Sequence, residues 1–168
     1  MDASPFKSSS PEMLAEIIRQ AEVRLTAQLT TGIAADQRAM TFAGLLLAAA
    51  VVLFGAALAT TLPSLRLGLI LSIGAGLTAA ASMAIWSAQP SDWDYVGNAP
   101  SQWLQDVAAG KSLHEAMAET ASWYDEMIAG NELVIASAAA TMRRAVFIAV
   151  LTTALGTIAA ATLALLNR

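Results

Sequence analysis

The sequence predicts an all-α membrane protein with three transmembrane helices, in which the first and third helices extend into the cytoplasm as a helical stalk. Three observations lead to this class. Of the 168 residues, 57% are hydrophobic and only 13% are charged, a composition too apolar for an ordinary soluble domain of this length. Three long stretches carry no charge, and recognisable helix starts precede the first and the third of them.

The charge-free stretches set the positions of the transmembrane helices. Each stretch without Asp, Glu, Lys or Arg is longer than the roughly 20 residues that cross a bilayer core. Within them we expect transmembrane helices at Met40–Leu62, Leu67–Ser87 and Ala145–Leu166. The rest of the chain then forms a cytoplasmic N-terminal amphipathic helix (1–39) and a cytoplasmic loop followed by a long helix (88–144).

The basic residues predict the orientation of the chain. Seven of the nine Lys and Arg residues precede the first transmembrane helix or lie between the second and the third. Because cytoplasmic segments carry the excess of Lys and Arg, we expect the N-terminus and residues 88–144 in the cytoplasm and the C-terminus outside. We therefore expect a multi-pass protein whose transmembrane helices contact the lipid bilayer.

Local patterns predict where the long helices begin. Ser10 precedes Pro11 and Glu12, and a serine cap followed by proline and an acidic residue favours a helix start. Ser112 and Glu115 have the spacing of a capping box. Between them and the second transmembrane helix, residues 89–110 contain proline, glycine and two tryptophans. We expect a loop there with one short helix near Ser101–Ala109.

The second long helix carries a seven-residue repeat, the pattern of a coiled-coil-like seam. Its members are Leu113, Met117, Ala121, Tyr124, Ile128, Asn131, Ile135, Ala138 and Met142. Asn131 interrupts an otherwise apolar series, and a buried asparagine in such a seam fixes the register at a cost in stability. The sequence therefore predicts that Asn131→Leu raises thermal stability but harms function.

Small residues recur at every fourth position of the second transmembrane helix. They are Gly68, Ser72, Gly76 and Ala80. Such spacing lets helix backbones approach closely. The face can serve packing within one three-helix bundle or contact between subunits of a homo-oligomer, and the sequence leaves both interpretations open.

One acidic residue stands at the start of the first charge-free stretch. Asp36 follows Leu25, Leu29 and Ile33 at near-helical spacing, so we expect it to point toward neighbouring helices. Matching the starts of the first and third transmembrane helices brings it near Arg143 and Arg144. We therefore expect Asp36 to pair with one of these arginines and tie the two helices together; the alternative is an exposed Asp36.

The sequence contains no combination of residues that indicates catalytic chemistry. The chain has a single histidine and no cysteine; His114 lies in the first turn of a helix, where a solvated histidine is the simplest interpretation. We expect no catalytic residue, no metal site, no cofactor and no nucleic-acid partner, so the protein is predicted not to be an enzyme. The predicted spans also lack the buried charges that ion-coupled transporters use.

Two short motifs resemble those of a known family. The first motif enters the first span and consists of Ala35, Asp36, Arg38 and Ala39. The second precedes the last span and consists of Asn131, Arg143 and Arg144. Together they resemble motifs of the transmembrane effectors of Pycsar-type antiphage defence and related SLATT-like membrane effectors. The resemblance covers about residues 12–165. It implies an inner-membrane effector of bacteria that binds a cyclic pyrimidine mononucleotide, oligomerises and impairs membrane integrity.

Candidate ligand contacts follow from the chemistry of such a nucleotide. Its phosphate requires cations, and its base stacks on flat side chains. The candidates are Arg143, Arg144, Trp123, Tyr124 and Asn131, with Arg19 and Arg24 as further cytoplasmic cations. The arginines can equally be interfacial anchors, and Tyr124 a seam residue. The competing function is a non-catalytic membrane scaffold or accessory subunit that docks a partner protein through its cytoplasmic helices.

Overall fold

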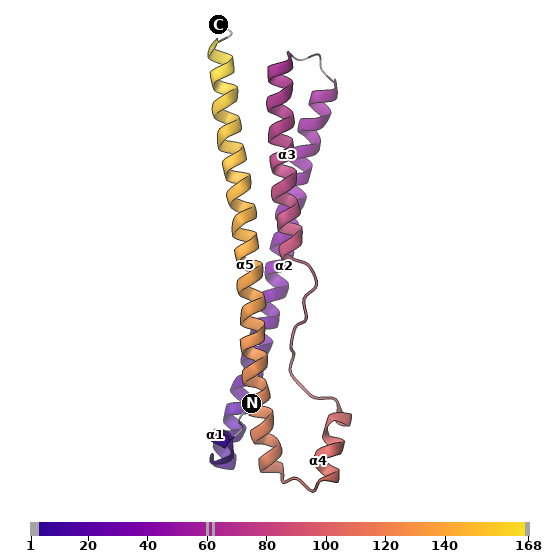
Figure 1. The fold of residues 1–168 in the computed structure, drawn as a ribbon, viewed down its shortest axis with the longest axis vertical. Coiled ribbons are helices and arrows are strands. Elements are labelled where there is room, and N and C mark those ends of the chain that lie inside the picture. Colours follow the sequence, from indigo (N-terminus) through magenta and orange to yellow (C-terminus); the bar gives the residue numbers. More distant parts are fainter. Residues whose placement is uncertain (1–3, 60, 62, 167–168) are drawn as a thin grey trace. The chain divides into compact units, whose positions relative to one another are not determined.

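The computed structural model describes residues 4–59, 61 and 63–166, and the described residues form helices and loops without a strand (Figure 1). The predicted all-α class is therefore confirmed. The elements are α1 (Ser4–Lys7), α2 (Pro11–Ala59), α3 (Ser64–Ser87), the 3-10 helix η1 (Pro100–Trp103), α4 (Leu104–Ala108) and α5 (Leu113–Leu166). The short helix expected near Ser101–Ala109 is present as η1 and α4.

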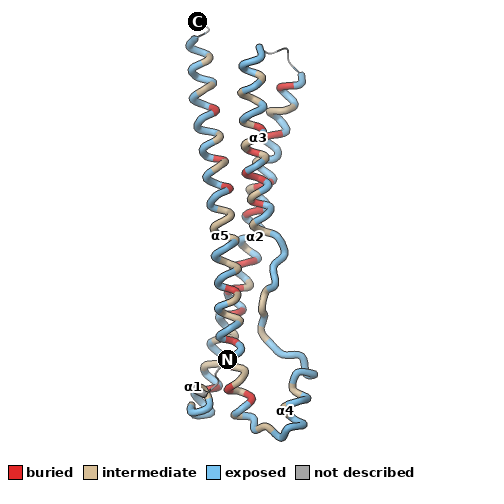
Figure 2. The backbone as a smooth tube through the Cα atoms, in the orientation of Figure 1, coloured by how far each residue is buried: buried red, intermediate tan, exposed pale blue. Residues whose placement is uncertain are grey.

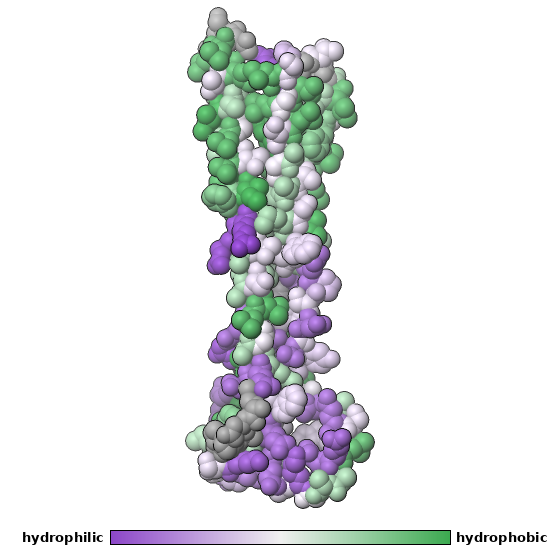
Figure 3. Space-filling view, viewed as in Figure 1, coloured by the Kyte–Doolittle hydropathy of each residue, from purple (hydrophilic) through white to green (hydrophobic). Residues whose placement is uncertain are grey.

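Three helices, α2, α3 and α5, are long and apolar enough to cross a membrane. They contain the three predicted spans, except that α2 ends at Ala59 and the predicted end at Leu62 lies outside the described residues. At most 28% of the most apolar window in each helix is buried. Their side chains thus leave a large apolar surface, green in Figure 3, of the kind that lipid covers.

The chain divides into two compact units. The first contains Met1–Ile33 and Ser91–Ile135, and the second contains Ala34–Pro90 and Ala136–Arg168. Both α2 and α5 contribute residues to each unit. The charged residues gather in the first unit, and the membrane-length apolar segments belong to the second.

The first unit is a helix pair with a small apolar core (Figure 2). Leu14 of α2 is buried with Ala118 and Ala121 of α5. The predicted seam of α5 is confirmed at its middle, since Ala121, Tyr124 and Asn131 are all buried. Leu113 is wrong as a seam member, because it is the first residue of the helix and is 70% exposed.

Both predicted helix starts are confirmed. The backbone N–H of Met13 donates to Ser10 Oγ at 3.2 Å. The capping box is complete: Ser112 N–H donates to Glu115 Oε2 at 3.0 Å, and Glu115 N–H donates to Ser112 Oγ at 3.3 Å. The Ser112 hydroxyl also donates to Glu115 Oε2 at 2.8 Å. This hydrogen bond, together with the one from the Ser112 N–H, favours the carboxylate and holds the pKa of Glu115 below its ordinary value of 4.5.

Glycines set the close contacts of the second unit. A Cβ added at Gly74 would lie 2.6 Å from the ring of Phe54 on α2, and one added at Gly76 would lie 2.5 Å from Thr152 Oγ1 on α5. Four buried alanines form a further contact among the three helices: Ala43 of α2, Ala81 and Ala84 of α3, and Ala145 of α5. Small side chains therefore allow α2, α3 and α5 to pack as one bundle.

Only part of the small-residue face predicted for contact between subunits is used for packing within the chain. Gly76 contacts Thr152 and Ala80 is fully buried, so these two positions serve packing within the chain. Gly68 and Ser72 are exposed, and an added Cβ at Gly68 would meet no described residue within 4 Å. A subunit contact through the exposed half of the face stays a prediction.

The ion pair predicted for Asp36 is not formed in the structure. Among the described residues, the ion pairs join Arg19 to Glu16, Arg24 to Glu132, and Lys111 to Asp106 and Glu119. Asp36 is half-buried, whereas Arg143 and Arg144 are exposed. The helix register is the reason. Ala43, not Met40, is buried with Ala145, which leaves the arginines more than one helical turn beyond Asp36.

Candidate functional site

A buried asparagine of α5 forms hydrogen bonds with the loop after α3 and with α2. Asn131 of α5 is fully buried. Its Nδ2 donates to the carbonyl of Asp94 at 2.9 Å, and its Oδ1 accepts from the Asp94 N–H at 3.1 Å. Asn131 Nδ2 also lies 3.4 Å from Gln28 Oε1 of α2, and Gln28 Nε2 donates to the Ile128 carbonyl at 3.1 Å. One side chain thus joins two helices and a loop.

A tryptophan ring makes a second attachment of the same loop. Trp93 packs so closely on Gly32 of α2 that an added Cβ would lie 2.5 Å from its Cζ2 atom. Gly32 is buried, whereas the neighbouring Ile33, expected on the core face, is 52% exposed. The absence of a side chain at residue 32 therefore creates the surface on which Trp93 rests.

Substitution of Gly32 should detach this ring. Gly32→Ala forces Trp93 to move, so we expect faster amide hydrogen exchange in residues 91–97 and a lower free energy of unfolding. Gly44→Ala on the same helix is the matched control, because nothing lies within 4 Å of its added Cβ. This control should gain about 1 kcal/mol from the better helix propensity of alanine. Equal stabilisation by both substitutions would contradict the Trp93 contact.

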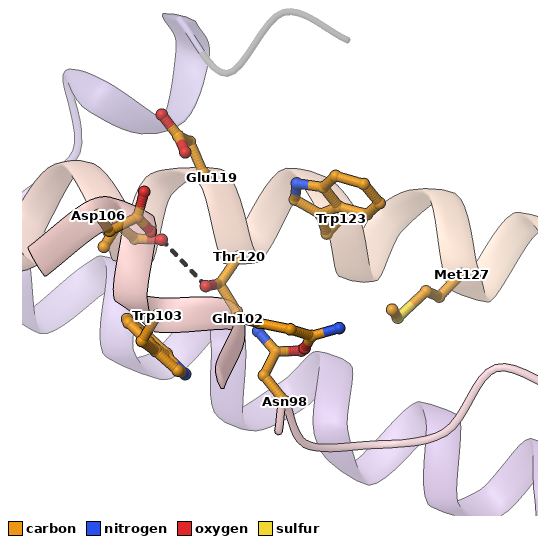
Figure 4. Close-up of a pocket in the computed structure, with 9 residues that line it drawn as sticks. Asn98, Gln102, Trp103, Asp106, Glu119, Thr120, Trp123 and Met127 are labelled. Carbon is orange, nitrogen blue, oxygen red and sulfur yellow. Dashed lines mark hydrogen bonds between the residues drawn. The ribbon is translucent and has the colours of Figure 1, made fainter. Parts of the chain in front are cut away.

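Beyond this attachment, the loop and α4 close a cavity against α5. The cavity has a volume of about 310 Å³. Trp123 of α5 is among its lining residues and is 62% exposed (Figure 4). Its lining residues are Asn98, Gln102, Trp103, Asp106, Ala116, Glu119, Thr120, Trp123 and Met127. Two indole rings, a thioether and two primary amides are therefore brought together from η1, the loop before it and α5.

A lysine bridge holds one end of this cavity. Lys111 Nζ lies 2.5 Å from Asp106 Oδ1 and 2.7 Å from Glu119 Oε2, joining the end of α4 to α5. Hydrogen bonds from Lys111 to these two carboxylates raise the pKa of its ammonium group. The bridge leaves one negative charge in excess, and no Lys, Arg or His is among the described lining residues.

The lining suits a flat, uncharged group better than an anion. Indole rings stack on heterocycles, and the amides of Asn98 and Gln102 offer both donors and acceptors. The carboxylates of Asp106 and Glu119 repel an anion at the same end. A nucleotide base therefore fits this chemistry inside the cavity, provided that its phosphate remains toward the solvent opening.

The predicted ligand residues do not come together in one site. Trp123 lines the cavity. Tyr124 is 3% exposed; its hydroxyl lies 3.4 Å from Glu22 Oε1, and burial raises its pKa. Asn131 is occupied by the loop, as described above. Arg143 and Arg144 belong to the second unit, where they line a separate hollow.

Most residues that line the cavity could not be predicted from the sequence. Asn98, Gln102 and Trp103 lie in the segment between α3 and α5, which has no periodicity, and only the presence of tryptophan at residues 93 and 103 marked it. Two further candidate cations, Arg19 and Arg24, are paired within the chain, Arg19 with Glu16 and Arg24 with Glu132. In the part of the chain that the structure describes, no group of three His, Cys, Asp or Glu side chains could hold a metal ion.

Comparisons with known protein families, with curated proteins and with solved structures find no match for this chain.

Proposed function

We propose that this protein is a ligand-responsive effector of antiphage defence in the bacterial inner membrane, which oligomerises and impairs membrane integrity when a cyclic nucleotide binds. One observation carries the proposal: the first unit places a cavity for a flat ligand directly on α5, and α5 continues into a membrane-length apolar segment. Because α5 belongs to both units, a ligand that binds in the first unit can change the conformation of the apolar segment of α5 in the second unit. The N-terminus and the cavity face the cytoplasm and the C-terminus lies outside.

The proposed ligand is a cyclic pyrimidine mononucleotide. Its base enters between the cavity walls, where Trp103 and Trp123 supply flat surfaces and Gln102 supplies an amide for the polar edge of the base. The cavity of about 310 Å³ has room for a base of this size, and the choice of a pyrimidine follows from the resemblance of the two short motifs to the Pycsar-type effectors. The phosphate points out of the open side, away from Asp106 and Glu119. No enzymatic step is required of the chain.

Ligand-dependent thermal stability tests this proposal. Cyclic UMP or cyclic CMP, but not cyclic AMP, should raise the melting temperature of the purified protein, because a ligand that binds only the folded state stabilises it. Trp123→Ala should abolish the shift. Trp86→Ala is the matched control, since Trp86 is similarly exposed, 68% against 62%, and lies in the second unit. A missing shift with all pyrimidine nucleotides, or a full shift in Trp123→Ala, would overturn the proposal.

A scaffold function is the second candidate, and exposed apolar residues favour it. Leu104 and Val107 of α4 and Leu113 at the start of α5 are 67%, 73% and 70% exposed in the polar first unit. Leu104 and Val107 are three residues apart on one helix and therefore share a face, and an exposed apolar face is typical of protein-binding surfaces. A protein partner that binds the wild type but not a Leu104→Ser, Val107→Ser variant, together with no response to nucleotides, would favour the scaffold.

A further inference from the structure

The second unit contains a hollow that the proposed nucleotide response does not use. It has a volume of about 460 Å³ and is lined by Met83 of α3 and by Ala140, Arg143, Arg144, Phe147 and Ile148 of α5. Two guanidinium groups therefore stand beside methionine, phenylalanine and isoleucine side chains. This combination fits a ligand with a phosphate at one end and a hydrocarbon at the other.

The two arginines are not neutralised within the chain. Both are exposed, and among the described residues neither takes part in an ion pair. The described residues that line the hollow include no acidic side chain. Guanidinium groups bind phosphate through paired N–H donors, so the site has free capacity for an anion.

Two independent features place this hollow at the level of a membrane surface. Arg143 and Arg144 immediately precede the charge-free stretch that begins at Ala145. Ser87 Oγ lies 4.0 Å from Met142 Sδ, so the last turn of α3 ends beside the arginines. That turn carries Trp86, which is 68% exposed. Exposed tryptophan and arginine at one level are typical of the interface between lipid headgroups and the hydrocarbon core.

The geometry points to a binding site for an anionic phospholipid, whose phosphate contacts Arg143 and Arg144 and whose acyl chain lies along Phe147 and Ile148. The inference rests on the proposed membrane insertion of the second unit, but it requires no nucleotide response. A soluble phosphate compound would leave the apolar half of the hollow uncovered, whereas a lipid covers both halves. Basic sites between membrane helices on the cytoplasmic side bind lipid headgroups in this way.

Lipid-dependent melting in a neutral detergent tests the site. Dioleoyl phosphatidylglycerol should raise the melting temperature of the full chain, whereas dioleoyl phosphatidylcholine and soluble glycerol 3-phosphate should not. An Arg143→Gln, Arg144→Gln variant should lose most of this shift, with binding weakened roughly fivefold for each arginine removed. The control is Arg38→Gln with Arg66→Gln, which removes two exposed arginines of the same unit from outside the hollow and should keep most of the shift.

Several outcomes would overturn the site. Equal shifts with phosphatidylcholine would show lipid binding without charge selection, and an equal shift with glycerol 3-phosphate would show a soluble-phosphate site. If the control variant loses as much of the melting-temperature shift as the Arg143→Gln, Arg144→Gln variant, the lipid is attracted to positive charge in general and not to this hollow. If the double glutamine variant yields no folded protein, Arg143→Gln and Arg144→Gln are compared singly. A full shift in both would contradict the proposal, and a reduced shift in either supports it.

Discussion

Asn131→Leu should lower the free energy of unfolding by about 2–3 kcal/mol, because the substitution leaves the partly buried backbone groups of Asp94 without their partner. Gln28 Oε1 would lose its contact as well. This expectation reverses the one drawn from the sequence, in which leucine simply completes an apolar seam. Chemical unfolding in detergent measures the effect, and amide exchange at Asp94 should accelerate in the folded state.

Asn98→Leu is the control for this substitution. Asn98 is an exposed asparagine of the same unit, so its loss should change the free energy of unfolding by less than about 0.5 kcal/mol. A stability gain in Asn131→Leu would support the original seam interpretation and contradict the role of Asn131 in fastening the loop. Unchanged exchange at Asp94 would contradict it as well.

Gly76→Leu should have the second large effect, a loss of folded protein with separation of α3 from α5. The new side chain would overlap Thr152, whose Oγ1 lies 2.5 Å from the position of an added Cβ. Thr152 is β-branched and has restricted rotamers in a helix, so the helices must move apart. Overpacking of this kind costs about 3 kcal/mol, measurable as a lower melting temperature in detergent.

Gly68→Leu separates packing within the chain from contact between subunits. Among the described residues, nothing lies within 4 Å of an added Cβ at Gly68, so this variant should fold normally. If the exposed half of the small-residue face joins subunits, Gly68→Leu should reduce the oligomer in cross-linking while its melting temperature stays near that of the wild type. A fully stable Gly76→Leu monomer would contradict the intrachain contact.

The helices could be predicted from the sequence because their signals are local. Charge-free length determines where a helix can cross a membrane, and the caps at Ser10 and Ser112 act within one turn. Local signals did not predict that Ile33 is exposed or that Asp36 forms no ion pair with Arg143 or Arg144. Both assignments depended on the rotation and register of α2 against its neighbours, which Gly32 and the alanine cluster around Ala43 determine.

The candidate site was harder to predict because it is built from a segment without periodicity. Nothing local in the sequence indicates that Asn131 bonds the backbone of Asp94, or that Trp93 rests on Gly32, since these contacts join residues far apart in the chain. Trp123 was identified from its side-chain chemistry alone. Trp103 required the path of the loop and α4, which only the folded chain provides.

Nucleotide-triggered leakage from vesicles tests the central claim most directly. The full chain is reconstituted into vesicles of phosphatidylethanolamine and phosphatidylglycerol that contain a self-quenching dye, and cyclic UMP, cyclic CMP or cyclic AMP is added on the side of the cavity. We predict dye release with a pyrimidine nucleotide, none with cyclic AMP, and loss of release in Trp123→Ala but not in Trp86→Ala. Release that is the same with and without nucleotide, or no release when binding is saturated, would contradict a ligand-responsive membrane effector.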